Sequence, residues 1–195
     1  GLVEGTVVRQ CASCHGYDGV GELSGLVPNL SIYNAAYLSA SLRAYADGTR
    51  RSGIMRPIAA SLTSGQIDQL ADWYARQPAE RAPEPDTMSP DLLDLGERLA
   101  NSGDGDVAAC ESCHGVAEAL EGEYPALRGQ AAAYQVSQLQ LFAKSGRGDV
   151  VDVNPMYAIS HELTDRQMQA VAAWYAVQTP GNYDLEEEYG TSGAR

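Results

Sequence analysis

A five-residue motif that occurs twice constrains this chain more than any other feature of its sequence. The pattern C-x-x-C-H stands at residues 11–15 and again at residues 110–114. This pattern is the attachment signature of c-type haem: the two thiols form thioethers with the haem vinyl groups, and the adjacent histidine reaches the iron. The two copies use all four cysteines of the chain. They predict two covalently bound haem c groups, held by Cys11, Cys14 and His15 and by Cys110, Cys113 and His114.

Other uses of four cysteines fit this arrangement poorly. A compact zinc site needs its two C-x-x-C pairs close together and requires no histidine after each pair. A thioredoxin-like redox pair needs a βαβ context, and the sequence has no strand-rich stretch. A disulfide framework is typical of shorter secreted chains than these 195 residues. Haem attachment explains both the cysteines and the histidines that follow them.

The surroundings of the motif are repeated as well, with an offset of about 99 residues. Two copies of this size indicate a duplicated domain rather than a solenoid. Four prolines between residues 78 and 90 favour an extended, semi-rigid connector between the copies. Matched pairs are Pro28 with Pro125, Tyr37 with Tyr134, Leu42 with Leu139, Thr63 with Thr164, and Trp73 with Trp174. We expect an N-terminal domain over 1–80, a linker over 81–91, a C-terminal domain over 92–180, and a disordered or loosely docked acidic tail over 181–195.

The periodicity of both halves is helical. Thr63 with Gln66 and Thr164 with Gln167 form capping-box patterns, each followed by apolar residues at i, i+3, i+4 and i+7. Earlier helices are predicted over 35–46 and 131–144, another over 92–101, and a short one before the first motif. We expect Trp73 and Trp174, in the last helix of each half, to pack against the helix that carries the motif.

Charge is distributed unevenly over a chain whose net charge is −13. Residues 1–85 carry seven arginines and eight acidic residues, whereas residues 86–195 carry six basic and eighteen acidic ones. Such an acidic half repels nucleic acid and anionic lipid and attracts basic protein surfaces. The alternative is that the acidity only keeps the protein soluble. No run approaches the roughly 18 apolar residues of a membrane span. We therefore expect no nucleic-acid partner and at most peripheral membrane association.

The motifs also bear on location. In bacteria, haem is attached to C-x-x-C-H outside the cytoplasm. The sequence therefore predicts a periplasmic protein that was exported on a signal peptide absent from this chain, which begins at Gly1 without a methionine.

The second axial position of each iron separates electron transfer from catalysis. All cysteines are used and only His161 remains among the histidines, so thiolate ligation and two bis-histidine sites are excluded. Met55 and Met156 occupy matching loops, each 18 residues before its tryptophan. We predict that they are the second axial ligands, with His15 and His114 as the first. Met168 is expected in the core, Met88 in the linker or at the interface between the domains, and His161 at the surface.

Pro28 and Pro125 follow the two motifs at similar distances. A backbone carbonyl commonly accepts a hydrogen bond from the free N–H of a ligating histidine, and this bond orients the ring and raises its donor strength. We expect these prolines to hold that carbonyl rigidly, although an ordinary turn remains an alternative.

From Gly5 to about Gln178, the chain resembles the dihaem cytochrome c4 family. The resemblance rests on C-x-x-C-H-G and Pro-x-Leu in each half, on the tract Leu-Arg-Gly-Gln-Ala-Ala-Ala-Tyr at 127–134, on the methionine loops, and on Ala-Ala-Trp-Tyr-Ala at 172–176. It implies an all-α fold of two tandem class I cytochrome c domains related by a pseudo-two-fold axis, with the haem propionate edges facing each other. The first half departs from the pattern: it lacks the Gly-Gln and has Ser31-Ile32 after Leu30. The resemblance implies that Tyr37, Tyr134, Arg50 and Arg147 contact the propionates.

The resemblance further implies single-electron transfer between redox proteins in the periplasm, from a donor to an acceptor such as a terminal oxidase or a dehydrogenase subunit. The chain is not expected to be an enzyme. Two alternatives stay open. One is an electron-accepting dihaem subunit of a dehydrogenase complex, because the dihaem subunit of flavocytochrome c sulfide dehydrogenase has a similar plan. The other is a haem enzyme such as a dihaem peroxidase, which needs an open or labile iron.

Overall fold

The computed structural model describes residues 5–22, 24–84, 88–115, 124–144, 147 and 154–181. These residues form helices with no named β-strand among them, so the predicted all-α class is confirmed. The acidic tail lies outside the described residues from position 182 onward. The helices are α1 Gly5–His15, α2 Ala35–Asp47, α3 Met55–Ala60, α4 Ser64–Ala75, α5 Pro90–Ser102, α6 Glu111–His114, α8 Ala132–Ala143, α9 Pro155–Glu162 and α10 Asp165–Val177.

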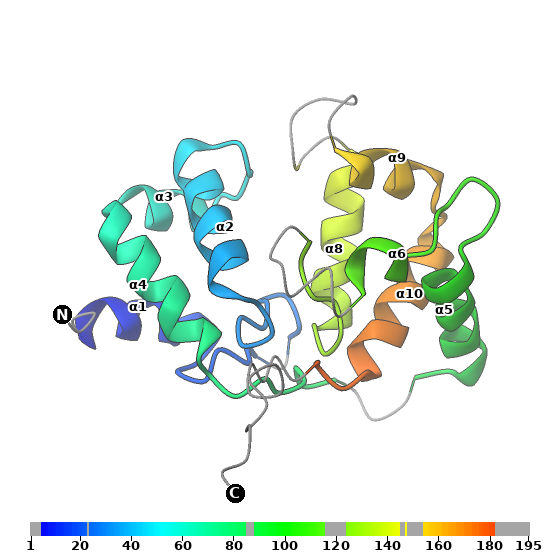
Figure 1. Cartoon of the computed structure of the whole chain (residues 1–195), viewed down its shortest axis with the longest axis horizontal. Coiled ribbons are helices and arrows are strands. Elements are labelled where there is room, and N and C mark those ends of the chain that lie inside the picture. The colour runs from blue at the N-terminus through cyan, green and yellow to red at the C-terminus, as the bar shows by residue number, and fades with distance from the viewer. Residues whose placement is uncertain are drawn as a thin grey trace, which may run out of the picture.

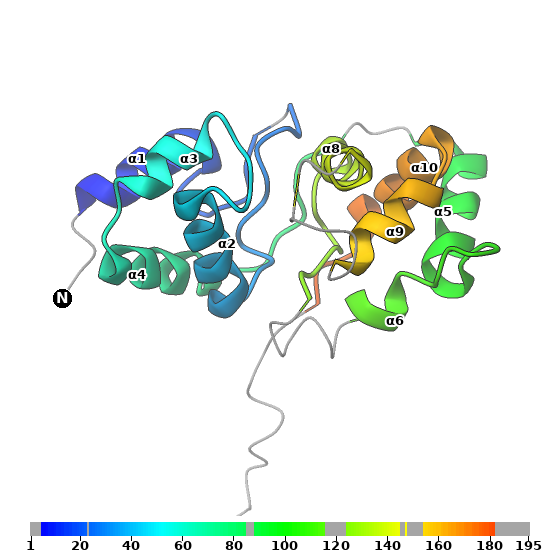
Figure 2. The same ribbon diagram turned by 90° about the horizontal axis from the view of Figure 1, so that it is seen from above.

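The helices form two groups that follow each other along the chain. Figure 1 shows α1–α4 on one side of the molecule and α5–α10 on the other. Figure 2, at right angles, shows the same separation, with α2 and α8 innermost in their groups. In the first group α2 packs on α3 and α4, and in the second α8 packs on α9 and α10. The repeat in the sequence is therefore also a repeat of helix packing.

Both predicted capping boxes are present. The N–H of Gln66 donates to Thr63 Oγ1 at 3.3 Å, and the N–H of Thr63 donates to Gln66 Oε1 at 2.9 Å. Thr164 and Gln167 repeat this pair at 3.3 and 2.9 Å. Each box satisfies two N–H groups at a helix start that would otherwise lack partners. This explains why α4 and α10 begin at matching positions.

The closest helix contact is between α5 and α10. A Cβ atom added to Gly96 of α5 would overlap the carbonyl oxygen of Ala170 and lie 2.7 Å from Trp174 Cβ. Trp174 is consequently buried, in a cluster with Ala100 of α5 that also contacts Cys110 of the second motif. Trp174 thus packs on α5 and on Cys110 of the motif, whereas the helix that carries the motif is α6.

The prediction for Trp73 is wrong, because this side chain is 39% exposed on α4. α1 and α4 are not among the helix pairs that contact each other extensively in the described residues, whereas α5 and α10 are. α1 therefore does not press against α4 as α5 presses against α10, and the indole is left at the surface. The two halves share their elements but not this helix crossing.

No helix among the described residues is long and apolar enough to cross a membrane.

The segment 78–84 runs between the two groups of helices and forms hydrogen bonds with the second group. The N–H of Ala82 donates to Gly129 O at 2.8 Å, Glu84 Oε1 accepts from the N–H of Ala132 at 2.7 Å, and Arg81 donates to Val177 O at 3.1 Å. These bonds hold the described part of the connector against the second group.

Candidate functional site

A cavity of about 480 Å³ lies in the first half, against the first C-x-x-C-H motif. Cys11, Cys14 and His15 line it from α1, and Met55 lines it from the start of α3. Its volume falls within the range of sites that hold cofactor-sized ligands. The rest of the wall is mostly apolar, with leucine, isoleucine and tyrosine side chains from α2, α3 and α4. The structure thus brings all four predicted haem-binding residues of this half to one cavity.

Both motif histidines are oriented by the predicted proline carbonyls. His15 Nδ1 donates to Pro28 O at 3.1 Å, and His114 Nδ1 donates to Pro125 O at 2.9 Å. Both rings are about nine-tenths buried. Burial lowers the pKa of each imidazole more than the carbonyl bond raises it. Each ring is therefore neutral with its proton on Nδ1, which leaves Nε2 as the free ligand atom.

None of the four cysteines forms a disulfide. Burial raises the pKa of Cys11, and it raises that of Cys110 to about 11. Burial thus disfavours the charged thiolate at both positions. Within each motif one turn of helix separates the two sulfur atoms, which suits bridging the two vinyl groups of a single haem rather than chelating a shared metal ion. In the described part of the chain, no three His, Cys, Asp or Glu residues gather as a metal site.

The two predicted methionine ligands stand in short helices rather than in loops. Met55 is the first residue of α3, and its N–H donates to Ser52 Oγ at 3.0 Å. Met156 is the second residue of α9, and its N–H donates to Asn154 Oδ1 at 3.0 Å. Both side chains are half-buried. A polar side chain thus holds each methionine at the start of its helix.

The predicted haem-binding residues of the second half are Cys110, Cys113, His114 and Met156. Residues 116–123 and 148–153 beside them lie outside the described part of the chain. Within that part, His114 is buried while Cys110, Cys113 and Met156 are half-buried. The other candidates lie where they were expected. Met168 is 4% exposed in α10, Met88 is half-buried in the linker, and the His161 side chain is 63% exposed.

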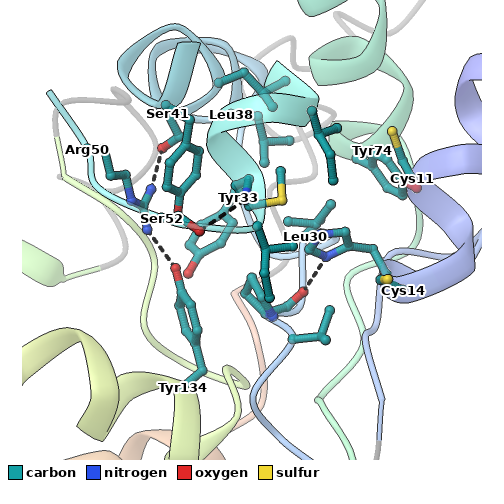
Figure 3. Close-up of a pocket in the computed structure, with 18 of the residues that line it drawn as sticks. Cys11, Cys14, Leu30, Tyr33, Leu38, Ser41, Arg50, Ser52, Tyr74 and Tyr134 are labelled. Atoms are coloured by element: carbon teal, nitrogen blue, oxygen red, sulfur yellow. Dashed lines mark hydrogen bonds between the residues drawn. The ribbon is translucent and has the colours of Figure 1, made fainter. Parts of the chain in front are cut away.

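Two arginines connect the halves at the rim of the cavity. Arg50 Nη2 donates to Tyr134 Oη at 2.7 Å, and Arg147 Nη2 donates to Tyr37 Oη at 2.8 Å. Gln138 Oε1 accepts from both guanidinium groups. Figure 3 shows Arg50 bonded to Ser41 and Tyr134 on one side of the pocket, with Cys11 and Cys14 on the opposite side. The structure therefore gathers all four residues for which the resemblance implied propionate contacts.

This rim attracts anions. Arg50 is only 7% exposed, and among the described residues neither Arg50 nor Arg147 has a carboxylate partner. Burial by itself raises the pKa of Tyr37, but Arg147 and Arg50 outweigh it and lower this pKa to about 8. A buried cation without a counter-charge is costly. A haem, which is apolar with two carboxylates at one edge, fits a cavity whose apolar wall ends in the buried Arg50 and the half-buried Arg147.

Sequence reasoning missed an ion pair in the second half. Arg128 Nη2 lies 2.8 Å from Glu111 Oε2, and the guanidinium stands over the Trp174 ring at 5.8 Å from its centroid. Glu111 lies inside the second motif, where the first has Ala12, and Arg128 stands where the first half has Ser31. The sequence signal for this ion pair was that two uncharged residues of the first half are replaced, at the matching positions of the second half, by one acidic and one basic residue.

Replacing Arg128 with glutamine should lower the free energy of unfolding by about 1–3 kcal/mol, because it leaves the half-buried Glu111 carboxylate without its partner. Denaturant unfolding of the haem-loaded protein measures this loss. Arg76→Gln is the control, since the Arg76 and Asp72 side chains are 80% and 57% exposed and lie 3.9 Å apart, and its effect should be near zero. Equal effects of the two substitutions would contradict the assigned role of Arg128.

Several known proteins are similar to this chain in sequence and in fold. A sequence model of the cytochrome c family matches residues 94–176. A thiosulfate dehydrogenase electron acceptor from Thiomonas intermedia is 36% identical over 86% of this chain and 78% of its own length. A cytochrome c4 from Thiocapsa roseopersicina is 30% identical over 84% of both chains. The cytochrome c4 structure from Acidithiobacillus ferrooxidans superposes with a TM-score of 0.72 at 29% identity, covering 86% of this chain and 98% of that one.

Proposed function

Because this chain belongs to the cytochrome c4-like family of dihaem cytochromes, which transfer electrons through two covalently bound haem c groups, we propose that it accepts electrons from a dehydrogenase that oxidises thiosulfate. The relative from Thiomonas intermedia carries this proposal, since it matches 86% of the chain and is itself a thiosulfate dehydrogenase electron acceptor. The fold of tandem cytochrome c domains is shared with solved cytochrome c4 structures. In this role the chain carries electrons and leaves substrate oxidation to its partner.

We further propose which residues hold the two haems. In the first half Cys11 and Cys14 form the thioethers, while His15 Nε2 and Met55 Sδ take the two axial positions. The support is that all four side chains line one cavity and that the Pro28 carbonyl fixes the imidazole. When bound, the haem supplies a one-electron couple. Ligation of the iron by both histidine and methionine would raise the reduction potential of the haem and would leave no position on the iron for a substrate.

The second haem is assigned to the matching residues of the repeat. Cys110 and Cys113 supply the thioethers, and His114 and Met156 the axial atoms. The support is the matching carbonyl bond of His114 to Pro125 at 2.9 Å and the matching position of Met156 at a helix start. The domain limits 1–80, 81–91 and 92–180 follow from the same repeat and are proposed with it.

Arg50, Arg147, Tyr37 and Tyr134 are proposed to receive the propionates. Each arginine already reaches a tyrosine of the other half, and each stacks on an aromatic ring of its own half, Arg50 over Tyr45 and Arg147 over Phe142, at 4.6 Å from the centroid. Hydrogen bonds and stacking hold the guanidinium groups between the two halves. The propionates of both haems would then meet near one another, which shortens the path for an electron between them.

The direct test is a redox titration followed by reduction kinetics on the haem-loaded protein. We expect two haems per chain, the weak long-wavelength absorption of methionine-ligated ferric haem from both, and rapid reduction by a thiosulfate dehydrogenase in the presence of thiosulfate. A haem that lacks this band and binds cyanide readily would overturn the proposed ligation. Reduction no faster than that of an unrelated cytochrome c would overturn the proposed partner.

The charge distribution predicts how a partner docks. Residues 86–195 carry six basic and eighteen acidic residues, so a basic partner surface should be steered toward this half. The association rate measured by stopped flow should fall steeply as salt is raised, because exposed charges are screened beyond about 8 Å at physiological ionic strength. A flat salt dependence would contradict this mode of docking.

We place the protein in the periplasm. The support is chemical, since haem is attached to C-x-x-C-H outside the bacterial cytoplasm. Fractionation of cells that express the full-length gene, followed by haem staining, tests the assignment. Holoprotein in the cytoplasmic fraction would overturn it.

A further inference from the structure

A glutamine of the second half reaches into the first half beside its axial histidine. Gln130 precedes α8 and is 1% exposed. Its Oε1 accepts from the N–H of Asn29 at 2.9 Å, and its Nε2 donates to the Asn29 carbonyl at 2.8 Å. One side-chain amide thus pairs with both backbone groups of a residue 101 positions away in the chain.

The bonded N–H of Asn29 belongs to the peptide unit whose carbonyl is Pro28 O. That carbonyl oxygen accepts the Nδ1–H of His15 at 3.1 Å. A continuous series therefore runs from the imidazole through one peptide group to the amide oxygen of Gln130. Successive hydrogen bonds polarise each other, strengthening each by perhaps 10–30%. An acceptor on the N–H side of a peptide makes its carbonyl oxygen a better acceptor.

The surrounding contacts hold this series rigidly. Asn29 is fully buried, and its Nδ2 donates to Glu80 O at 2.7 Å. The Gln130 carbonyl accepts from Gln135 Nε2 at 2.8 Å, and Gln130 Nε2 also donates to Tyr33 Oη at 2.8 Å. Contacts from both halves therefore fix the same amide pair, which leaves little freedom for the peptide to turn.

The second half has no matching arrangement among the described residues. Pro125 O accepts from His114 Nδ1, but no hydrogen bond of the Ala126 N–H occurs in the described part of the chain. Tyr33 stands at the repeat position of Gln130. Its hydroxyl group accepts a hydrogen bond from Gln130 Nε2, and its side chain forms no hydrogen bond with Ala126 in the described part of the chain. Among the described residues, such a series therefore runs only from the second half to the first histidine.

We propose that Gln130 of the second half is a positioning residue that tunes the first haem through the Pro28–Asn29 peptide and His15. The inference rests on the proposed ligation of that haem by His15. A stronger Nδ1–H bond makes the imidazole a stronger donor, which favours the oxidised iron and lowers the potential. Docking of the two halves is then itself a determinant of the difference between the two potentials.

The test replaces Gln130 with leucine in the haem-loaded protein. The ratio of reduced to oxidised first haem at a fixed potential should rise about threefold, which is roughly 30 mV at 59 mV per tenfold change, while the second haem stays unchanged. In proton–nitrogen NMR spectra of the reduced protein, the His15 Nδ1–H resonance should move toward weaker bonding and exchange faster, with His114 unaffected.

Two further variants keep the result interpretable. Gln130→Glu retains an oxygen that accepts from the Asn29 N–H, and its protonated form also donates to the Asn29 carbonyl, so at a pH that protonates this buried carboxyl group the first potential should stay at or below that of the wild type. Met168→Ala is the destabilising control, because this buried side chain of α10 packs in a cluster with Val107 and Leu163 that contains none of these groups. It should lower stability without moving the His15 resonance.

The outcomes separate the two levels of inference. If the wild-type protein shows no signal of an iron-bound His15, the proposed ligation fails. If that signal is present but Gln130→Leu leaves both it and the first potential unchanged, or shifts both haems equally, the role of Gln130 fails while the ligation stands. If Gln130→Leu does not fold, a first potential in Gln130→Glu above that of the wild type overturns the proposal.

Discussion

Replacing Gly96 with alanine is expected to destabilise the protein by about 3 kcal/mol, the upper end of what overpacking usually costs. The added methyl group would overlap the Ala170 carbonyl and press on Trp174 Cβ at 2.7 Å. The two helices must separate to admit it, and α5 on α10 is the most extensive helix pair among the described residues. Denaturant unfolding of the haem-loaded protein measures the loss.

Gly65→Ala is the matched control. Gly65 is also a helical glycine, in α4, but a Cβ there meets nothing within 4 Å. Alanine is a better helix former than glycine, so this variant should be unchanged or more stable by up to about 1 kcal/mol. A loss for Gly96→Ala no larger than the effect at Gly65 would show that α5 and α10 do not meet as closely as the structure has them.

Replacing Met55 or Met156 with alanine is expected to open one haem each. Loss of the thioether ligand should lower the potential of that haem by a sizeable part of the roughly 0.8 V over which axial ligands tune haem iron. The long-wavelength band of methionine-ligated haem should fall by half in each single variant and disappear in the double variant. The opened haem should bind cyanide rapidly while the other remains closed.

Met168→Ala and Met88→Ala are the controls for this experiment. Met168 is buried in α10, so its truncation should cost about 2–5 kcal/mol of stability and leave both bands intact. Met88→Ala in the linker should change neither the bands nor the potentials. A full band in Met55→Ala, or a band lost in Met168→Ala, would contradict the assignment of the axial ligands.

The sequence predicted most of the local structure correctly, because the signals for it are local. The capping boxes begin α4 and α10 at the predicted residues, and the repeat anticipated that both histidines meet a proline carbonyl. Both methionines were predicted to lie in loops. They begin short helices instead, since Ser52 and Asn154 cap their N–H groups.

The predictions that failed depend on how helices approach one another. Trp73 and Trp174 occupy the same repeat position, yet only Trp174 is buried, because Gly96 lets α5 close on α10 and α1 offers no such approach. Gln130 was visible only as part of a family pattern. Its contact with Asn29 spans 101 residues, and no local periodicity encodes a pairing at that separation.

By itself, the sequence determined the cofactor and its number, because thioether attachment needs only a pentapeptide, and it determined that the two halves repeat. The tertiary structure decided how the halves act on each other. It alone places Arg50 against Tyr134, Arg147 against Tyr37 and Gln130 against Asn29. These bonds cross an interface that forms only when two folded halves meet, and hydrogen bonding acts over about 3 Å, whatever the distance along the chain.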